Sequence, residues 1–170
     1  LSFLTRYRDA VFGPVPTIFT GINDFQEELV GELENVTGVA EDLSIRETIA
    51  FAMETMPGDT VAIVADGTVT SERNISVVRA ALTALDWDGS VQTYNPLSSD
   101  QLSLLSRTID PTDIVLLVGS ILDSNGDWID FSVAGSLVAA ASPAPVFSFW
   151  DFYNGTGIVG GKMASGVVQG

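Results

Sequence analysis

Apolar and polar residues alternate along this chain in blocks that switch between two periods. Short, nearly continuous apolar runs bounded by glycine, proline or polar residues predict buried strands. Longer segments between them repeat apolar residues three and four positions apart, which predicts helices with one buried face. The strands are expected over residues 14–21, 36–43, 60–66, 90–95, 113–120 and 144–151. The helices are expected over residues 1–12, 44–56, 70–85, 98–109 and 128–141.

The helix expected at 44–56 has the clearest ends. Ser44 can cap its amino end, Glu47 completes a capping box, and Pro57 with Gly58 stops it. From there strands and helices follow one another in turn, and strands without a polar face are typical of a parallel sheet covered on both sides. The sequence therefore predicts an α/β fold, a doubly wound parallel sheet with helices on both faces.

Composition excludes several kinds of function. The 170 residues include 22 acidic and 7 basic ones, a formal net charge of −15, so nucleic acid is not an expected partner. Cysteine and histidine are both absent. Thiolate catalysis, a Ser-His-Asp triad and zinc–thiolate or imidazole sites are therefore excluded, and we expect no catalytic residues, metal or cofactor.

A glycine pattern near the carboxyl end resembles two nucleotide-binding motifs. Gly155, Gly157 and Gly160 spell G-x-G-x-x-G, and Gly161-Lys162 matches part of a phosphate loop. The dinucleotide motif needs a following strand and acidic residue, and Met163 stands where a phosphate loop needs serine or threonine. We therefore interpret these glycines as bends in a crossing segment.

The segment 123–130 begins like a calcium loop, with Asp123, Asn125 and Asp127 alternating. Trp128 replaces the glycine expected at the sixth position, and Ala134 replaces the glutamate expected at the twelfth. A polar turn before the next helix is the favoured interpretation.

Four segments, in this order, resemble one known family. They are RYRDAVFGPVPTIFTGIND, NVTGVAEDLSIRETIAFAMETMPGDTVAIVADG, IVLLVGS and GIVGGKMASG. Their order and spacing resemble ABC-transporter-type substrate-binding domains of the type I periplasmic binding fold. The most similar pattern is that of extracytoplasmic sensor domains of bacterial sensor histidine kinases.

The resemblance implies two similar α/β lobes joined by crossing segments, with the first lobe largely missing from this chain. Residues 1–37 would be a remnant of lobe one and a crossing, 38–155 a complete lobe two, and 156–170 a crossing back and the start of a lobe-one helix. It also implies an extracytoplasmic domain in the periplasm or at the cell surface. Any membrane anchor would lie in flanking segments, and a homodimer is a further expectation.

The function implied is closure around a small organic ligand, amino-acid-like or sugar-like, that is then sensed or delivered without catalysis. Because parallel strands place their carboxyl-terminal loops on one edge, the ligand-binding residues are expected at strand ends. They are Asn23, Asp24, Asp66, Thr68, Ser120, Trp150, Asp151 and Tyr153. Trp150, Phe152 and Tyr153 cluster at the end of the last strand, and aromatic walls with one carboxylate suit a small organic ligand such as an amine. We expect the site side chains at loop tips, with Trp150 equally consistent with the cleft and with the core.

An α/β enzyme is the alternative. A hydrolase would use carboxylates at the strand ends as acid and base. No pair is placed for this by spacing alone, so a binding domain is favoured.

Overall fold

The computed structural model describes residues 2–23, 30, 33–41 and 43–161. The described residues form two compact units that divide between Leu43 and Ser44. We call the part before this division unit 1 and the part from Ser44 onward unit 2. The carboxyl-terminal part of the predicted return crossing, 162–170, lies outside the described residues, and the assignment of the units to two lobes of one binding fold stays a prediction.

The described residues of unit 1 form one helix and a small sheet. The helix is α1 (Ser2–Phe12), and the strands are β1 (Thr17–Asn23) and β2 (Val36–Glu41). The strands pair in parallel, starting with Thr17 opposite Val36, and the register shifts between Thr20 and Ile22. These elements match the apolar runs expected in this part of the sequence.

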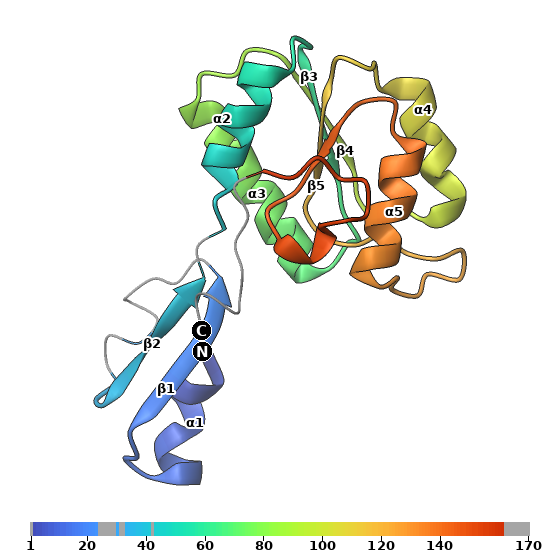
Figure 1. The fold of residues 1–170 in the computed structure, drawn as a ribbon. Helices are drawn as coiled ribbons and strands as arrows, with labels where there is room; N and C mark the ends of the chain where they lie inside the picture. Colours follow the sequence, from blue (N-terminus) through green and yellow to red (C-terminus); the bar gives the residue numbers. More distant parts are fainter. Residues whose placement is uncertain (1, 24–29, 31–32, 42, 162–170) are drawn as a thin grey trace. The chain divides into compact units, whose positions relative to one another are not determined.

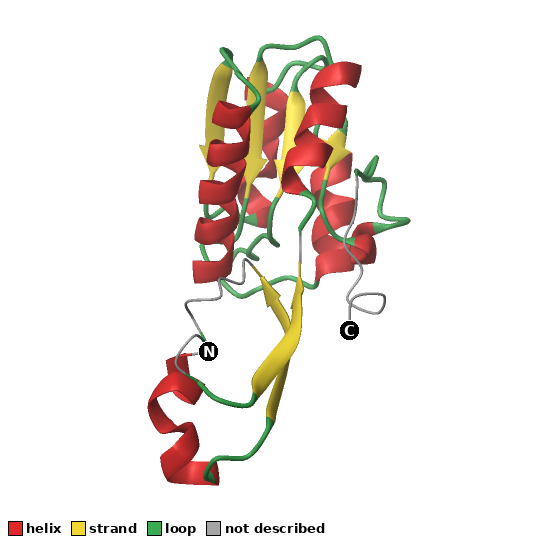
Figure 2. Ribbon diagram, turned by 90° about the vertical axis from the view of Figure 1, so that its left-hand side faces the viewer, coloured by secondary structure: helices red, strands yellow, loops and turns green. Residues whose placement is uncertain are grey.

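Unit 2 carries the larger fold, in which η marks a 3-10 helix. Its elements are α2 (Ile45–Thr55), β3 (Thr60–Val64), α3 (Val69–Ala84), β4 (Ser90–Tyr94), η2 (Ser99–Leu104), α4 (Leu105–Thr108), β5 (Ile114–Leu117), α5 (Phe131–Ala141), β6 (Val146–Phe147) and η3 (Asp151–Tyr153). The strands form one parallel sheet in the order β4-β3-β5-β6. Figure 1 shows α2 and α3 on one face of this sheet and α4 and α5 on the other, and Figure 2 shows the strands between these layers. The predicted α/β architecture with parallel strands is confirmed.

The core of unit 2 follows directly from the apolar strands. Every residue of β3 and β5 is buried, whereas the edge strand β4 is only half-buried. The helices contribute buried aliphatic residues such as Ile49, Val78 and Val138. Because no residue of these two central strands is exposed, helices must cover both faces of the sheet and exclude water from its side chains.

Some local expectations were wrong in detail. Ser44 occupies the N-cap position of α2, but its side chain makes no capping hydrogen bond. The helix expected at 98–109 is a 3-10 helix followed by a single α-turn, and its start is closed by a capping box between Ser98 and Gln101. The helix expected from residue 128 begins at Phe131, because Asp130 caps it through the backbone N–H of Ser132. In the described part of the chain no helix has the length and apolar character needed to span a membrane.

Candidate functional site

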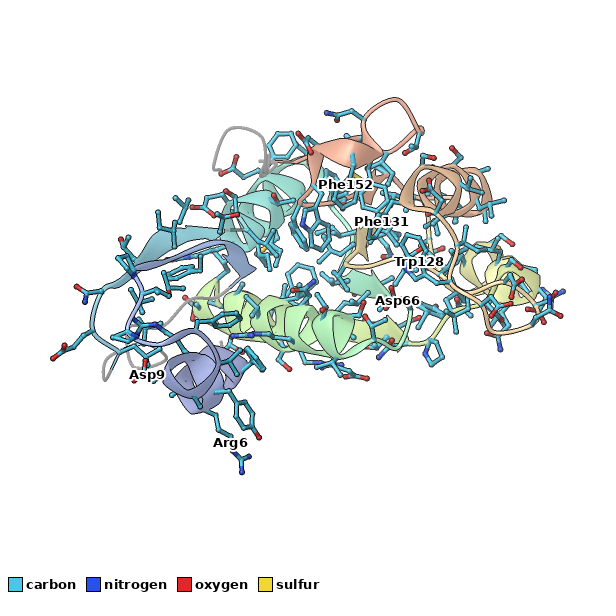
Figure 3. All side chains as sticks on the ribbon, turned by 90° about the horizontal axis from the view of Figure 1, so that it is seen from below. Arg6, Asp9, Asp66, Trp128, Phe131 and Phe152 are labelled. Atoms are coloured by element: carbon cyan, nitrogen blue, oxygen red, sulfur yellow. The ribbon has the colours of Figure 1, made fainter. Side chains whose placement is uncertain are left out.

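The middle of the unit 2 sheet contains a topological switch. β3 and β5 are neighbours, but the chain passes from β3 through α3 to β4 on one side and from β5 through α5 to β6 on the other. The two loops therefore diverge at the carboxyl ends of the strands, the place where open α/β sheets bind ligands. Figure 3 views the molecule from below, with Asp66, Trp128, Phe131 and Phe152 labelled along this edge. We take this edge of unit 2 as the candidate site.

Asp66 follows β3, and its hydrogen bonds link the loop after β3 to the loop after β5. Its Oδ1 accepts hydrogen bonds from the backbone N–H of Thr68 (3.0 Å), from Thr68 Oγ1 (2.8 Å) and from Ser71 Oγ (2.5 Å). Its Oδ2 accepts the backbone N–H of Ser120, in the loop after β5, at 3.0 Å. Asp66 is only 6% exposed, and a carboxylate can be buried to this extent because these donors replace its lost hydration.

The same bonds keep Asp66 charged. Burial alone would raise the pKa of its carboxyl group, but hydrogen bonds from Ser71, Thr68 and Ser120 to the ionised form outweigh burial and lower the pKa below its ordinary value. A carboxylate held in this way is a weak base at neutral pH. It is suited to fixing the two loops and poorly suited to abstracting a proton.

The carbonyl groups at the end of β5 are also paired by side chains from other elements. Ser148 donates to the carbonyl of Leu117, and Asn74 donates to that of Val118. Tyr153 completes the set, because its hydroxyl donates to the carbonyl of Gly119 at 2.6 Å. The loop after β5 is therefore fixed from both neighbouring loops, and its carbonyls are not left unpaired in the interior.

Tyr153 is fully buried. Burial raises the pKa of its hydroxyl, and the negative charges of Asp66 and Asp130 raise it further. The hydroxyl therefore stays protonated and remains a hydrogen-bond donor at any physiological pH.

The loop after β4 is joined to the same edge by Asn95. The backbone N–H of Gly67 donates to Asn95 Oδ1 at 2.7 Å, and Asn95 Nδ2 donates to Glu72 Oε1 at 2.6 Å. Together with Asp66, this side chain makes the strand-end loops one connected framework. Such preorganisation lowers the entropy that a ligand would lose in ordering its site.

The predicted site residues fall into three groups. Asp66, Thr68 and Ser120 are brought into direct contact, and Tyr153 lies close enough for the charge of Asp66 to act on its hydroxyl. Asp151 is half-buried in η3. Two predicted residues belong to unit 1: Asn23 ends β1, with a side chain that is not described, and Asp24 lies outside the described residues.

The expectation that these side chains lie at loop tips is wrong for several of them. Asp66, Ser120 and Tyr153 are buried, and Trp150 is 9% exposed, with its ring against those of Phe149 and Phe152. The physical reason is that each buried polar group has found an internal partner, including the carbonyl of Ile129 for the Ser120 hydroxyl. Thr68 alone among the described hydroxyl-bearing predictions is exposed.

Aromatic side chains form a row at this edge, which extends from the predicted cluster around Phe152 to Phe131 and Trp128, two residues that the sequence analysis missed. Trp128 meets Phe131 edge-on with ring centres 4.8 Å apart, and Phe131 lies against Phe152 at 4.4 Å. Phe152 also stacks on Trp150 at 5.6 Å and 16°. Trp128 and Phe152 remain 48% and 42% exposed. We call Trp128, Phe131 and Phe152 the aromatic wall.

Gly119 should tolerate no side chain, because a Cβ there would overlap Ser71 Oγ and approach Asp66 Oδ2 to 3.3 Å. Gly119→Ala is expected to lower the free energy of unfolding by about 2 kcal/mol, the cost of overpacking. Urea unfolding followed by tryptophan fluorescence measures the change. In a Ser71→Ala background the overlapping oxygen is gone, so Gly119→Ala should then cost at least about 1 kcal/mol less. If the two substitutions change the free energy of unfolding by strictly additive amounts, the overlap is removed by movement of atoms other than Ser71 Oγ.

The glycine motif does not build a phosphate loop within the described residues. Residues 154–161 form turns and one isolated bridge, and the helix that precedes them is the short η3. Gly155 and Gly157 have φ of 84° and 92°, a conformation that side chains disfavour. Their role in bending the chain is confirmed, whereas their part in a crossing between two lobes stays a prediction.

The calcium-like segment is a hydrogen-bonded turn. Asp123 Oδ1 accepts the backbone N–H groups of Asn125 and Asp127, both at 2.8 Å. These bonds lower the pKa of Asp123, with the Asp127 N–H contributing most. Nowhere in the described ranges do three or more potential ligands gather as a metal site.

Comparison with known proteins leaves the family open. No family model, no curated protein and no solved structure matches this chain.

Proposed function

We propose that this chain is part of an extracytoplasmic, non-catalytic domain that binds a small organic molecule, in the manner of a type I periplasmic binding protein or a sensor domain. The observation that carries the proposal is the structure of the sheet edge in unit 2. There an exposed aromatic wall lies on loops that are fixed from behind by Asp66 and Tyr153. Rigid loops, apolar ring surface and a few polar groups are typical of small-molecule sites.

The same geometry disfavours the hydrolase alternative. Ser120 donates to a backbone carbonyl, and Ser71 donates to Asp66, whose pKa is lowered. A nucleophilic serine needs a neighbouring base that can accept its proton, and a strongly hydrogen-bonded carboxylate of low pKa is a poor one. Both serines are also buried, so a substrate could reach neither without a change of structure.

In this proposal the ligand contacts differ from those expected from the sequence. The aromatic wall, Thr68 and Asp151 face the ligand, while Asp66, Ser120 and Tyr153 support them from behind. The signal or transport step would then follow from closure of a second lobe, since a ligand shifts a conformational equilibrium only by binding one state more tightly. Attachment to a sensor kinase or a transporter is part of the same proposal.

A ligand screen tests the function. Thermal-shift measurements on the whole chain with amino acids, sugars, amines and small aromatic compounds should give at least one stabilising hit, because binding to the folded form raises its melting temperature. For that hit, calorimetry on Phe152→Ala should show affinity weakened at least about fivefold, since stacked aromatic contacts dominate many sites. The control is Trp87→Ala, which removes a half-buried aromatic side chain after α3 and outside the candidate site. A ligand whose affinity is unchanged in Phe152→Ala would place the binding site elsewhere.

A further inference from the structure

Carboxylates lie beside each residue of the aromatic wall in the sequence. Along the sequence Asp127 and Asp130 flank Trp128 and Phe131, and Asp151 precedes Phe152. Residues 118–130 and 148–161, the loops after β5 and β6, contain four aspartates and neither lysine nor arginine. The wall is therefore apolar in its centre and negative at its margin.

This distribution of charge favours a cationic ligand over an anionic one. The start of α5 would ordinarily attract an anion, but Asp130 already caps it, with Oδ1 accepting the backbone N–H of Ser132 at 2.9 Å and its hydroxyl at 2.6 Å. Hydrogen bonds from Ser132 keep Asp130 ionised by lowering its pKa. An anionic ligand would meet repulsion here, whereas a cation would be attracted both by the carboxylates and by the negative faces of the rings.

The rings also select the kind of cation. A metal ion needs oxygen, nitrogen or sulfur ligands, and aromatic rings supply none of them. Asp123 stands at the first position of the calcium-like segment, but its Oδ1 already accepts the backbone N–H groups of Asn125 and Asp127. A large, weakly hydrated organic cation gains most from ring faces, because it loses little hydration when it leaves water.

We propose that the aromatic wall binds an organic ammonium ion, with the alkylated nitrogen over the exposed ring of Trp128 and with Asp130 as its main countercharge. This inference rests on the proposed function and names its ligand class. A partly exposed ring surface that contacts a ligand from one side gives only weak affinity. We therefore expect binding in the millimolar range for this chain, with a dissociation constant of about 1 mM to 10 mM.

The test compares choline with its neutral carbon isostere, 3,3-dimethylbutan-1-ol, by NMR titration of the whole chain at low salt. The two probes have almost the same shape, so their difference isolates the charge. Choline should bind at least about fivefold more tightly, and the indole N–H signal of Trp128 should shift while that of Trp87 does not. Added salt should reduce the difference in affinity between choline and the neutral isostere, because exposed charges are screened.

Two variants separate the rings from the charge. Trp128→Ala should weaken choline binding about fivefold, and Trp128→Phe should restore part of it, because a smaller ring keeps a weaker negative face. Asp130→Asn removes the charge but keeps an oxygen that can cap α5, so a loss of about threefold to fivefold would not be a folding effect. The matched control is Asp110→Asn, an exposed aspartate in the loop before β5, which should leave binding unchanged.

The outcomes distinguish this inference from the proposed function. If choline and the neutral isostere bind equally, or if neutral compounds from the screen bind at the wall and choline does not, the ammonium inference is wrong and the binding function stands. If choline at about 100 mM shifts no signal of the wall and the screen gives no ligand there either, both are wrong.

Discussion

Asp66→Ala is expected to lower the free energy of unfolding of unit 2 by about 3 kcal/mol or more, among the largest effects of any single polar substitution in this chain. The substitution removes the acceptor of the Ser71 hydroxyl and of two backbone N–H groups. The donors of Ser71 and Ser120 stay buried, and an unpaired buried donor costs about 1–3 kcal/mol. The sequence analysis placed Asp66 at a loop tip, which would have predicted almost no effect on folding.

Urea unfolding monitored by tryptophan fluorescence provides the measurement. Glu54→Ala is the control, because it removes an exposed carboxylate from α2 and should change stability by less than about 0.5 kcal/mol. Asp66→Asn should fall between the two, since the amide keeps an acceptor but loses the charge. Equal stability of wild type and Asp66→Ala would show that the loops after β3 and β5 do not depend on this carboxylate.

The lowered pKa of Asp66 gives a pH test of the same bond network. Because the pKa in the folded chain lies below the ordinary value of 3.8, the stability that the charge contributes is fully present above that value and is lost as pH falls through the folded pKa. The difference in stability between wild type and Asp66→Asn should therefore be constant near neutral pH and shrink below about pH 4. Asp123 and Asp130 also have lowered pKa values, but both are present in each protein and cancel in the difference.

The architecture of unit 2 was predictable because its signals are local. Apolar runs without a polar face, such as those of β3 and β5, are typical of strands that are buried on both sides in a parallel sheet. The order of the strands in the sheet was not predictable in the same way, because no residue of β3 indicates that β5 will pair with it. Helix ends were only partly predictable. Asp130 caps α5 by accepting the backbone N–H of Ser132. Ser44 stands at the N-cap position of α2 but makes no capping hydrogen bond.

The sequence predicted which residues meet at this edge better than it predicted their burial, and their role in binding stays a prediction. Asp66, Thr68 and Ser120 were expected together because parallel strands share an edge, and they are in contact. Whether a polar side chain turns outward or inward depends on partners far away in the sequence. Tyr153 turns inward because the carbonyl of Gly119, 34 positions earlier, needs a donor. The hydrogen bond between Tyr153 and Gly119 could not be predicted from the sequence alone.

The aromatic wall was predicted only in part, because Phe152 was expected in a cluster with Trp150 and Tyr153, whereas Trp128 and Phe131 were not connected with it. Trp128 was considered only as the residue that spoils a calcium loop, and Phe131 only as part of a helix. Their relation to Phe152 arises because α5 begins beside the loop after β6, which brings the three rings within contact distance. An aromatic residue in each of two loops at one sheet edge was the available signal.

Tyr153→Ala should destabilise unit 2 by about 3–5 kcal/mol, as large-to-small changes do at fully buried aromatic positions. Tyr153→Phe isolates the hydroxyl: it keeps the ring but leaves the carbonyl of Gly119 without its donor, for an expected loss of about 1–2 kcal/mol. Unfolding by urea measures both, and the neighbouring Phe152→Ala is the control. Because Phe152 is 42% exposed, its truncation should cost about 1 kcal/mol or less in stability.

These neighbouring positions should therefore separate folding from binding. Phe152→Ala should weaken a ligand and leave stability nearly intact, whereas Tyr153→Phe should lower stability and leave the ring surface of the aromatic wall in place. The opposite result, with a stable Tyr153→Phe protein that no longer binds, would mean that the Tyr153 hydroxyl contacts the ligand directly. In that case η3 would have to turn over on binding, since the hydroxyl is buried against Gly119 in the unliganded chain.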